Sequence, residues 1–289
     1  MQVTKRIHAL KIPFTIPVSK EITIERFAFV YLLVGEKIHV IDSGVAGAQS
    51  LLWDYIEQHG RKPEEISTLL LTHSHPDHIG AAQAIKARSG CTVISHEDER
   101  NWIEDTAQQF HDRPVPGFQK LVDGPVKVDR LVAGGETLEL EKGLSCRIIH
   151  TPGHSKGSVS LYFADEKSLF TGDALAFPGD LPIYEDIAEC LRSITALQRM
   201  ENVDHLFSSW EPPIQGRALI AERMGASIAY LKRIHAAVIA SSNDQNREDI
   251  MLLCQQAVKA IGLPPFAANP LVARAFASSL AARGNPDLS

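Results

Sequence analysis

Four side chains of the kind that bind metal ions lie within the short run HSHPDH at residues 73–78. They are His73, His75, Asp77 and His78. Imidazole and carboxylate groups are ligands that divalent zinc, iron and manganese accept in proteins. The run therefore predicts a metal site that holds one ion or two.

The elements around this run place it in a loop. An apolar strand candidate at 68–72 precedes it, and a helix candidate at 79–89 follows it. His73 and His75 are two residues apart, so their side chains project to the same side of an extended segment. Pro76 disfavours helix at the residue before it and keeps the loop open there. The last two ligands of the run then begin the turn into the helix, where they can face a second point nearby.

The first two thirds of the chain alternate between short strand candidates and helix candidates. The strand candidates are 22–34, 37–42, 68–72, 92–95, 146–150, 159–163, 168–171 and 205–209, and the helix candidates are 48–59, 79–89, 97–106 and 187–200. Alternation of this kind predicts a layered α/β domain. A hairpin turn at Gly35 and Glu36, ahead of the alternating units, predicts mixed sheets.

From Gln215 onward the strand pattern stops. Helices are predicted at 217–241, 247–261 and 269–283, and a polar stretch separates the first two. This segment has two interpretations, a packing appendage or dimer surface, and a lid that shapes a substrate pocket. The stretch 106–126 has no clear periodicity, and its aromatic residues favour a loop that forms a pocket wall.

Composition narrows the class of protein. A net charge of −6 over 289 residues gives no basic footprint for nucleic acid. No apolar run approaches the roughly 20 residues that span a bilayer. We expect no signal peptide, because charges and prolines interrupt the first 20 residues. The four cysteines are widely spaced, which favours reduced thiols and a cytoplasmic location.

Four motifs together resemble those of the metallo-β-lactamase superfamily. They are DSG at 42–44, THSHPDHIG at 72–80, TPGHS at 151–155 and FTGD at 170–173, and they occur in the family's order over about residues 20–212. The resemblance implies an αββα sandwich, with two mixed sheets and helices outside them. We assign the catalytic domain to residues 1–214 and an all-helical extension to residues 215–289.

The resemblance also implies the ligands. It places a first ion on His73, His75 and His154, a second ion on Asp77 and His78, and Asp173 as the bridge between the two ions. Zinc is the expected ion, with iron and manganese as alternatives. Asp42 is expected to hold the histidine loop by hydrogen bonds. His96, at the end of a strand, is either an outer partner of the site or merely buried.

One position departs from the family pattern. The family usually closes its second metal site with a late histidine, and Trp210 stands there in this chain. An indole N–H cannot ligate a metal ion. Either the second site lacks one ligand, or Glu211 or a water replaces it, or only one ion binds tightly.

Such a site predicts hydrolysis, because a bound divalent ion lowers the pKa of water toward 7 and yields hydroxide at neutral pH. Asp77 is the expected proton shuttle, and Tyr184 is a candidate donor to the oxyanion. The absence of export, nucleic-acid and flavin features favours an ester, thioester or lactone of a small molecule. Two alternatives remain, a metal-binding regulatory protein of low turnover and a mononuclear iron dioxygenase-like member. A homodimer through the C-terminal helices is also expected.

Overall fold

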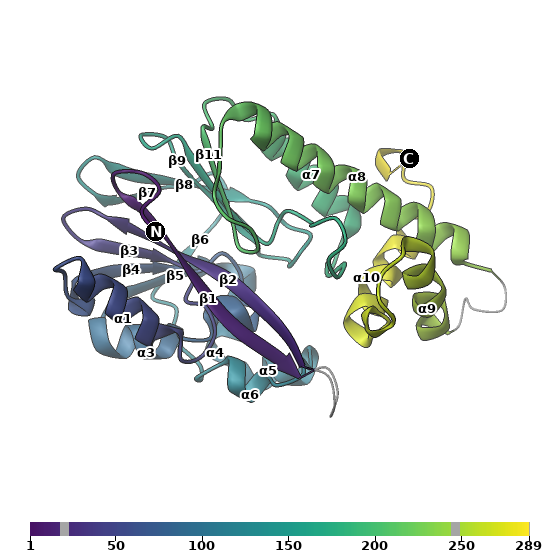
Figure 1. The fold of residues 1–289 in the computed structure, drawn as a ribbon, viewed down its shortest axis with the longest axis horizontal. Coiled ribbons are helices and arrows are strands. Elements are labelled where there is room, and N and C mark those ends of the chain that lie inside the picture. Colours follow the sequence, from purple (N-terminus) through teal and green to yellow (C-terminus); the bar gives the residue numbers. More distant parts are fainter. Residues whose placement is uncertain (18–22, 244–248, 289) are drawn as a thin grey trace. The chain divides into compact units, whose positions relative to one another are not determined.

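The computed structural model describes residues 1–17, 23–243 and 249–288, and it divides into two compact units (Figure 1). The first unit comprises Met1–His150, Val159–Gly172 and His205–Ile214. The second comprises Thr151–Ser158, Asp173–Asp204 and Gln215–Ser289. Two predicted starts, Ile22 for a strand and Arg247 for a helix, lie outside the described residues.

The first unit contains two mixed six-stranded sheets. The first sheet consists, in order, of β1 (Ile7–Pro17), β2 (Thr23–Val34), β3 (Ile38–Ile41), β4 (Ile66–Leu70), β5 (Thr92–His96) and β6 (Arg130–Val132). The first three strands are antiparallel, and β3 to β6 run parallel. The parallel strands bring their carboxyl ends to one edge, where the histidine run follows β4.

The second sheet consists, in order, of β12 (Ile214–Gln215), β11 (His205–Ser208), β10 (Ser168–Gly172), β9 (Val159–Phe163), β8 (Leu144–His150) and β7 (Thr137–Glu141). Strands β7 to β10 pair antiparallel, whereas β10 and β11 are parallel. Asp173 and the Ser209–Trp210 pair therefore follow the ends of two neighbouring parallel strands. This arrangement confirms the predicted mixed sheets.

Strand β2 separates two apolar cores, because its side chains alternate between opposite faces. Tyr31 and Leu33 belong to the core that lies between the two sheets, where Tyr31 packs edge-on against Phe170 and Phe207. Val30 and Leu32 belong to the core on the other face. Both faces are buried, which explains why the sequence of this strand reads as a nearly continuous apolar run.

Helices cover that other face of the first sheet (Figure 1). They are α1 (Ala48–Gln58), α2 (Pro76–Ile79), α3 (Ala82–Ser89), α4 (Arg100–Glu104), α5 (Thr106–Asp112) and α6 (Phe118–Leu121). Leu52 and Ile85 from two of these helices are almost fully buried in the core. Burying one such side chain contributes about 1.5–3 kcal/mol.

Two local predictions were wrong. The stretch 106–126 contains α5 and α6, and these helices are too short to give a helical periodicity. Phe118 packs in the helix-side core, and the pocket wall predicted for this stretch stays a prediction. Strand β1 was also not predicted from the sequence, because Pro13 and Pro17 interrupt it. Both prolines are tolerated, since β1 is an edge strand.

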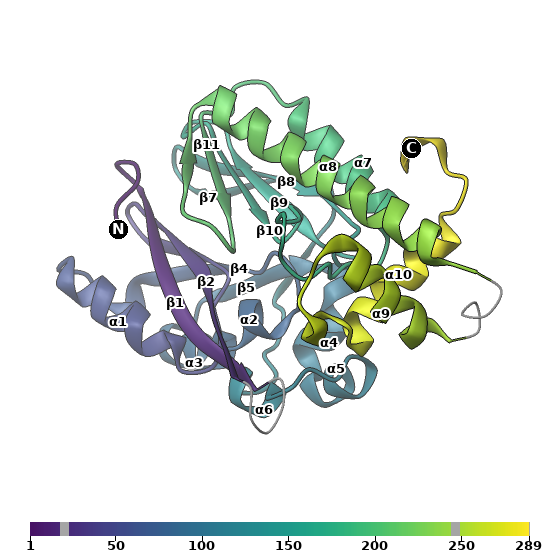
Figure 2. The same cartoon turned by 45° about the vertical axis from the view of Figure 1, so that its right-hand side comes forward.

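The second unit is helical. It contains α7 (Ile187–Gln198), α8 (Arg217–Ser241), α9 (Ile250–Ile261) and α10 (Pro270–Ala281), and Figure 2 shows α9 and α10 beside one end of α8. Asp186, Asp249 and Asn269 cap three of these helices by accepting backbone N–H groups. The predicted C-terminal helices are confirmed. The boundary between residues 214 and 215 stays a prediction.

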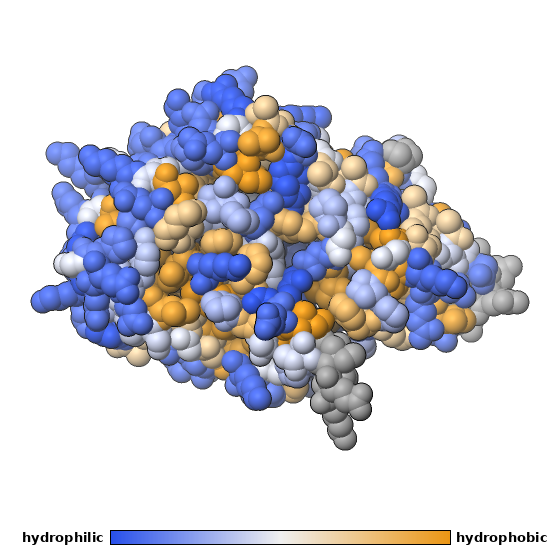
Figure 3. Space-filling view, viewed as in Figure 1, coloured by the Kyte–Doolittle hydropathy of each residue, from blue (hydrophilic) through white to orange (hydrophobic). Residues whose placement is uncertain are grey.

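Among the described residues, short 3₁₀ helices occupy three connections, namely Pro63–Glu65, Glu97–Glu99 and Pro265–Ala267, and a fourth, Pro286–Leu288, follows α10. No helix among the described residues is long and apolar enough to cross a membrane. Hydrophilic and hydrophobic side chains are interspersed on the face drawn in Figure 3. The exposed large hydrophobic residues include Leu51 on α1, Leu219 on α8 and Leu252 on α9.

Buried histidines make the fold sensitive to acid. Burial lowers the pKa of His8, His39 and His235, and at His39 the nearby Glu141 carboxylate opposes the shift. The unfolded chain therefore binds more protons than the folded chain below the ordinary histidine value of 6.5.

We therefore expect the free energy of unfolding to fall as the pH drops through about 6.5, in protein freed of divalent ions by a chelator. Urea unfolding between about pH 8 and pH 5.5 measures this effect. His235→Gln should weaken the pH dependence, whereas substitution of the exposed His111 by Gln serves as the matched control and should leave it unchanged. A profile that is the same in wild type and His235→Gln would contradict the assignment.

Candidate metal centre

The histidine run lies in a buried loop between β4 and α2. His73, His75 and His78 are each at most 3% exposed. His75 has an extended backbone conformation directly before α2, and Pro76 occupies the first turn of that helix. Both features are expected, because proline favours an extended conformation at the residue before it and is common at the first position of a helix. The loop therefore presents its imidazoles inside the protein and away from solvent.

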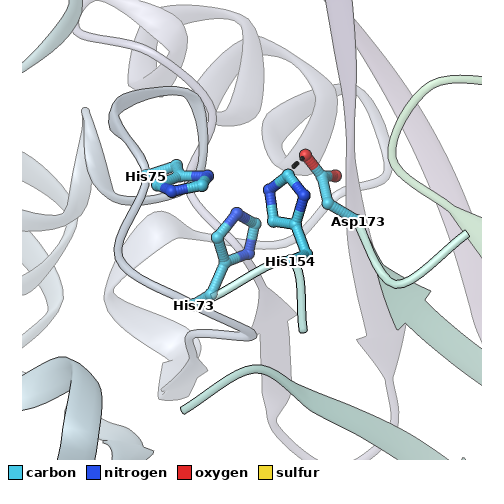
Figure 4. A group of neighbouring side chains, drawn as sticks. All are labelled: His73, His75, His154 and Asp173. Carbon is cyan, nitrogen blue, oxygen red and sulfur yellow. Dashed lines mark ion pairs between the residues drawn. The ribbon is translucent and has the colours of Figure 1, made fainter. Parts of the chain in front are cut away.

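The six predicted ligands form two groups of donor atoms. In the first group, the donors of His73, His75, His154 and Asp173 all lie within 4.8 Å of one another (Figure 4). In the second group, the donors of Asp77, His78 and Asp173 meet the same limit. Three imidazoles and one carboxylate suit a divalent ion such as zinc. Asp173 belongs to both groups, as the bridging role requires.

Asp42 holds the histidine loop, as predicted. Its Oδ1 accepts the backbone N–H of Thr72 at 2.8 Å, and its Oδ2 accepts the Thr72 hydroxyl at 2.8 Å. The Nδ1 of His78 donates to the same Oδ2 at 2.8 Å. Because Nδ1 carries the proton, the lone pair of His78 Nε2 is directed toward the second donor group.

The Thr72 hydroxyl extends this network to His73. It lies 3.1 Å from His73 Nδ1, and because its proton goes to Asp42 it accepts from that nitrogen. His73 is thereby held with Nε2 as its metal-facing atom. The backbone of Asp42 has a φ of 59°, which is rare outside glycine. A left-handed backbone conformation at this residue fits a position constrained by function.

Two further residues fix the middle of the loop, and the sequence did not reveal them. The carboxylate of Glu99 accepts the backbone N–H of Ser74 at 2.9 Å and also the Ser74 hydroxyl. The amide of Gln109 on α5 donates to the Ser74 carbonyl. Glu99 and Gln109 are 3% and 1% exposed, respectively. Their identification needs the fold, because no local motif links them to the histidine run.

His154 and Asp173 lie in the loops that follow β8 and β10. The Nδ1 of His154 donates to the Ile183 carbonyl at 2.9 Å, and its Nε2 lies 3.4 Å from Asp173 Oδ2. Gly153 precedes this ligand with a φ of 127°. A Cβ at Gly153 would lie 2.3 Å from the backbone nitrogen of Cys190, so only glycine allows this approach to α7.

Three other residues considered in the sequence have different surroundings. Tyr184 is 5% exposed, and its hydroxyl lies 2.9 Å from that of Ser279. Its role as an oxyanion donor stays a prediction. His96 caps the following turn through the backbone N–H of Asp98 and stacks on His150. It belongs to neither donor group.

Trp210 stands where a late histidine was expected, and its side chain packs within the first unit. The guanidinium of Arg26 lies 4.3 Å from the centre of its ring, and the Phe14 ring lies 6.3 Å away. The neighbouring Glu211 accepts the Ser208 hydroxyl at 3.1 Å. Neither Trp210 nor Glu211 belongs to the second donor group, so among the described residues that group has three members and the first has four.

Comparisons with known proteins point to one family. The family model described as "Metallo-beta-lactamase superfamily" matches residues 23–209. A probable metallo-hydrolase of Methanocaldococcus jannaschii is 31% identical over 212 residues, which cover 70% of this chain and 92% of that protein. A hydroxyacylglutathione hydrolase of Hyphomonas neptunium is 28% identical, over 54% of this chain and 53% of that protein.

Solved structures agree at the level of fold. A metallo-beta-lactamase family protein of Thermus thermophilus superposes with a TM-score of 0.71 at 21% identity, over 94% of this chain and 92% of that chain. A beta-lactamase domain protein of Burkholderia ambifaria gives a TM-score of 0.67 at 18% identity, over 97% and 88% of the two chains.

We expect Asp42→Asn to weaken zinc binding by about 10- to 100-fold, because an amide cannot accept hydrogen bonds from both Thr72 and His78 as the carboxylate does. Competition with a chromophoric chelator measures the dissociation constant. Asp54→Asn removes an exposed carboxylate from α1 and is the matched control. Equal zinc affinity in Asp42→Asn and wild type would show that the network does not support the metal site.

Because the two donor groups are unequal, we expect a zinc titration monitored by calorimetry to show two binding phases, one tight and one weak. Trp210→His should strengthen the weak phase, because imidazole supplies a fourth ligand that indole cannot. Trp210→Phe removes the indole without adding a ligand, and it should leave the weak phase weak. Two equally tight sites in the wild type would argue against a ligand-poor second site.

Proposed function

The chain belongs to the metallo-beta-lactamase superfamily, and on this basis we propose that it is a metal-dependent hydrolase of a small ester, thioester or lactone. The observation that carries the proposal is the convergence of His73, His75, His154 and Asp173 on one point. Zinc is the ion we propose, since three imidazoles and a carboxylate are typical of its sites.

The fit of the donor set to a metal ion has a second support. Asp77 Oδ2 is buried and makes no hydrogen bond to the described residues, and it lies 3.4 Å from His78 Nε2. A buried carboxylate oxygen without a hydrogen bond is costly unless a cation or substrate satisfies it. A divalent ion bound nearby would supply that charge.

A bound divalent ion would polarise the scissile carbonyl and lower the pKa of water toward 7. The protein's own residues then perform the remaining tasks. Asp42 and the Ile183 carbonyl orient the imidazoles of His78 and His154. We assign Asp77 to proton transfer, since its carboxylate can accept a proton from the attacking water and pass it to the leaving group.

The substrate class rests on two arguments. Relatives of 28% identity include hydroxyacylglutathione hydrolases, whose name describes the cleavage of a thioester. The net charge of −6 does not favour a nucleic-acid substrate. We therefore propose that a small acyl thioester is the first substrate class to test, followed by esters and lactones.

Hydrolysis of a panel of acyl thioesters, aryl esters and acyl lactones tests the proposal, with zinc-loaded protein and a thiol-sensitive or pH-sensitive dye. We expect turnover of at least one class, its loss after treatment with a chelator, and its recovery on addition of zinc. Asp77→Asn should lower kcat by about 10²–10⁴-fold. Glu97→Gln changes an exposed carboxylate that belongs to neither donor group and is the control.

Fully metal-loaded protein that hydrolyses no member of the panel would contradict the proposal and favour a metal-binding regulatory role. Iron as the ion retained after anaerobic purification, together with oxygen-dependent turnover, would contradict it in favour of a mononuclear iron dioxygenase. A cytoplasmic location and a homodimer through the C-terminal helices remain proposals from the sequence.

A further inference from the structure

We propose that helix α10 positions the metal ligand His154 through a relay of two hydrogen bonds joined by the backbone. Ser279 hydrogen-bonds the Tyr184 hydroxyl, the peptide chain links Tyr184 to Ile183, and the Ile183 carbonyl accepts from His154. The inference rests on the proposed metal centre, and specifically on His154 as a ligand. It assigns the C-terminal helices a role in metal affinity in addition to packing. All residues of the relay belong to the second unit.

The relay ends at an imidazole whose tautomer is fixed. His154 Nδ1 lies 2.9 Å from the Ile183 carbonyl oxygen, which can only accept a hydrogen bond. Nδ1 is therefore protonated, and the lone pair on Nε2 remains for a metal ion. A displaced Ile183 carbonyl would release the ring to rotate and would favour neither tautomer. Metal affinity therefore depends on the position of one backbone oxygen.

The segment that carries this oxygen is bound to the loop of His154 on both sides of Tyr184. The backbone N–H groups of Glu185 and Asp186 both donate to the Gly153 carbonyl, at 2.7 and 3.0 Å. Together with the bond to Ile183, these contacts join residues 183–186 to residues 153–154. Tyr184 lies in the middle of this short connection, so a shift of its side chain would be passed on to the segment.

Helix α10 holds the same segment through two consecutive serines. The Tyr184 hydroxyl lies 2.9 Å from the Ser279 hydroxyl, and the Ser278 hydroxyl accepts the backbone N–H of Ile187 at 3.0 Å. Tyr184 is 5% exposed and Ser279 is fully buried. Burial also raises the pKa of Tyr184, so its hydroxyl stays protonated and able to donate at neutral pH.

The burial of this hydroxyl pair gives the relay its strength. Removing either hydroxyl leaves the other buried without its partner, which is costly in a low-dielectric interior. We expect Tyr184 to shift when this hydrogen bond is lost, and the Ile183 carbonyl is attached directly to the backbone nitrogen of Tyr184. An outer partner of a metal-binding histidine typically changes metal affinity by 10–100-fold when it is removed.

The test uses the full-length chain and two single variants, Tyr184→Phe and Ser279→Ala, with their double variant. Ser227→Ala is the matched control, because it removes another fully buried serine hydroxyl from the second unit. Zinc affinity is measured by competition with a chromophoric chelator, and the ligand field is measured from the absorption spectrum of the Co²⁺-loaded protein. Circular dichroism and urea unfolding establish that each variant folds.

We expect either single variant to weaken the tight zinc phase on the order of 10-fold, at the lower end of the range for such partners. The Co²⁺ spectrum should change in both. The double variant should bind zinc no more weakly than the weaker single variant, because both substitutions break the same hydrogen bond. Ser227→Ala should retain wild-type affinity. If Tyr184→Phe fails to fold, Ser279→Ala carries the test alone.

Wild-type zinc affinity and an unchanged Co²⁺ spectrum in folded Ser279→Ala would overturn the relay. A lower kcat in Tyr184→Phe at unchanged zinc affinity would also overturn it, in favour of an oxyanion donor. Failure of the proposed function gives a different result. In that case the wild type binds zinc and the variants weaken it, but no substrate is hydrolysed.

Discussion

The hydrogen bond between a ring Nδ1 proton and a fixed acceptor is the interaction on which the candidate site depends. An imidazole binds a metal ion with only one nitrogen, and the other must be held by a partner for the ring to stay in place. Asp42 serves this purpose for His78 and, through Thr72, for His73. The Ile183 carbonyl does so for His154. The sheets and helices bring these acceptors to the imidazoles.

Much of this arrangement could be predicted from the residues alone. The dense ligand run after an apolar strand predicted the metal loop, and the resemblance of four ordered motifs to those of the metallo-β-lactamase superfamily predicted the sandwich. The nearly continuous apolar run of β2 and the polar residues at the starts of α7 and α10 are local properties, which is why the element types could be predicted directly. The position of Asp42 was identified through its motif's resemblance to the family, and its role followed because a carboxylate there can hold the histidine loop by hydrogen bonds.

The residues that escaped prediction act through long-range contacts or through the backbone. Glu99 and Gln109 reach Ser74 from 25 and 35 residues away, and nothing in their local sequence marks them. Ile183 contributes only a carbonyl, which every residue type possesses. Short helices such as α5 were read as loop because seven residues do not establish a period. Trp210 could be recognised as a departure, but its packing against Arg26 required the fold.

The backbone acceptor at Ile183 has an implication for how such a chain can diversify. No exchange of side chain at that position deletes the carbonyl, so the identity of residue 183 is uncoupled from the hydrogen bond that it makes. Selection can then vary this side chain, two residues before the carboxylate-rich turn into α7, for other purposes without dismantling the imidazole's support. The same protection is absent at Asp42, where the acceptor is the side chain itself. One position is thus robust to mutation and the other fragile, although both do the same chemical work.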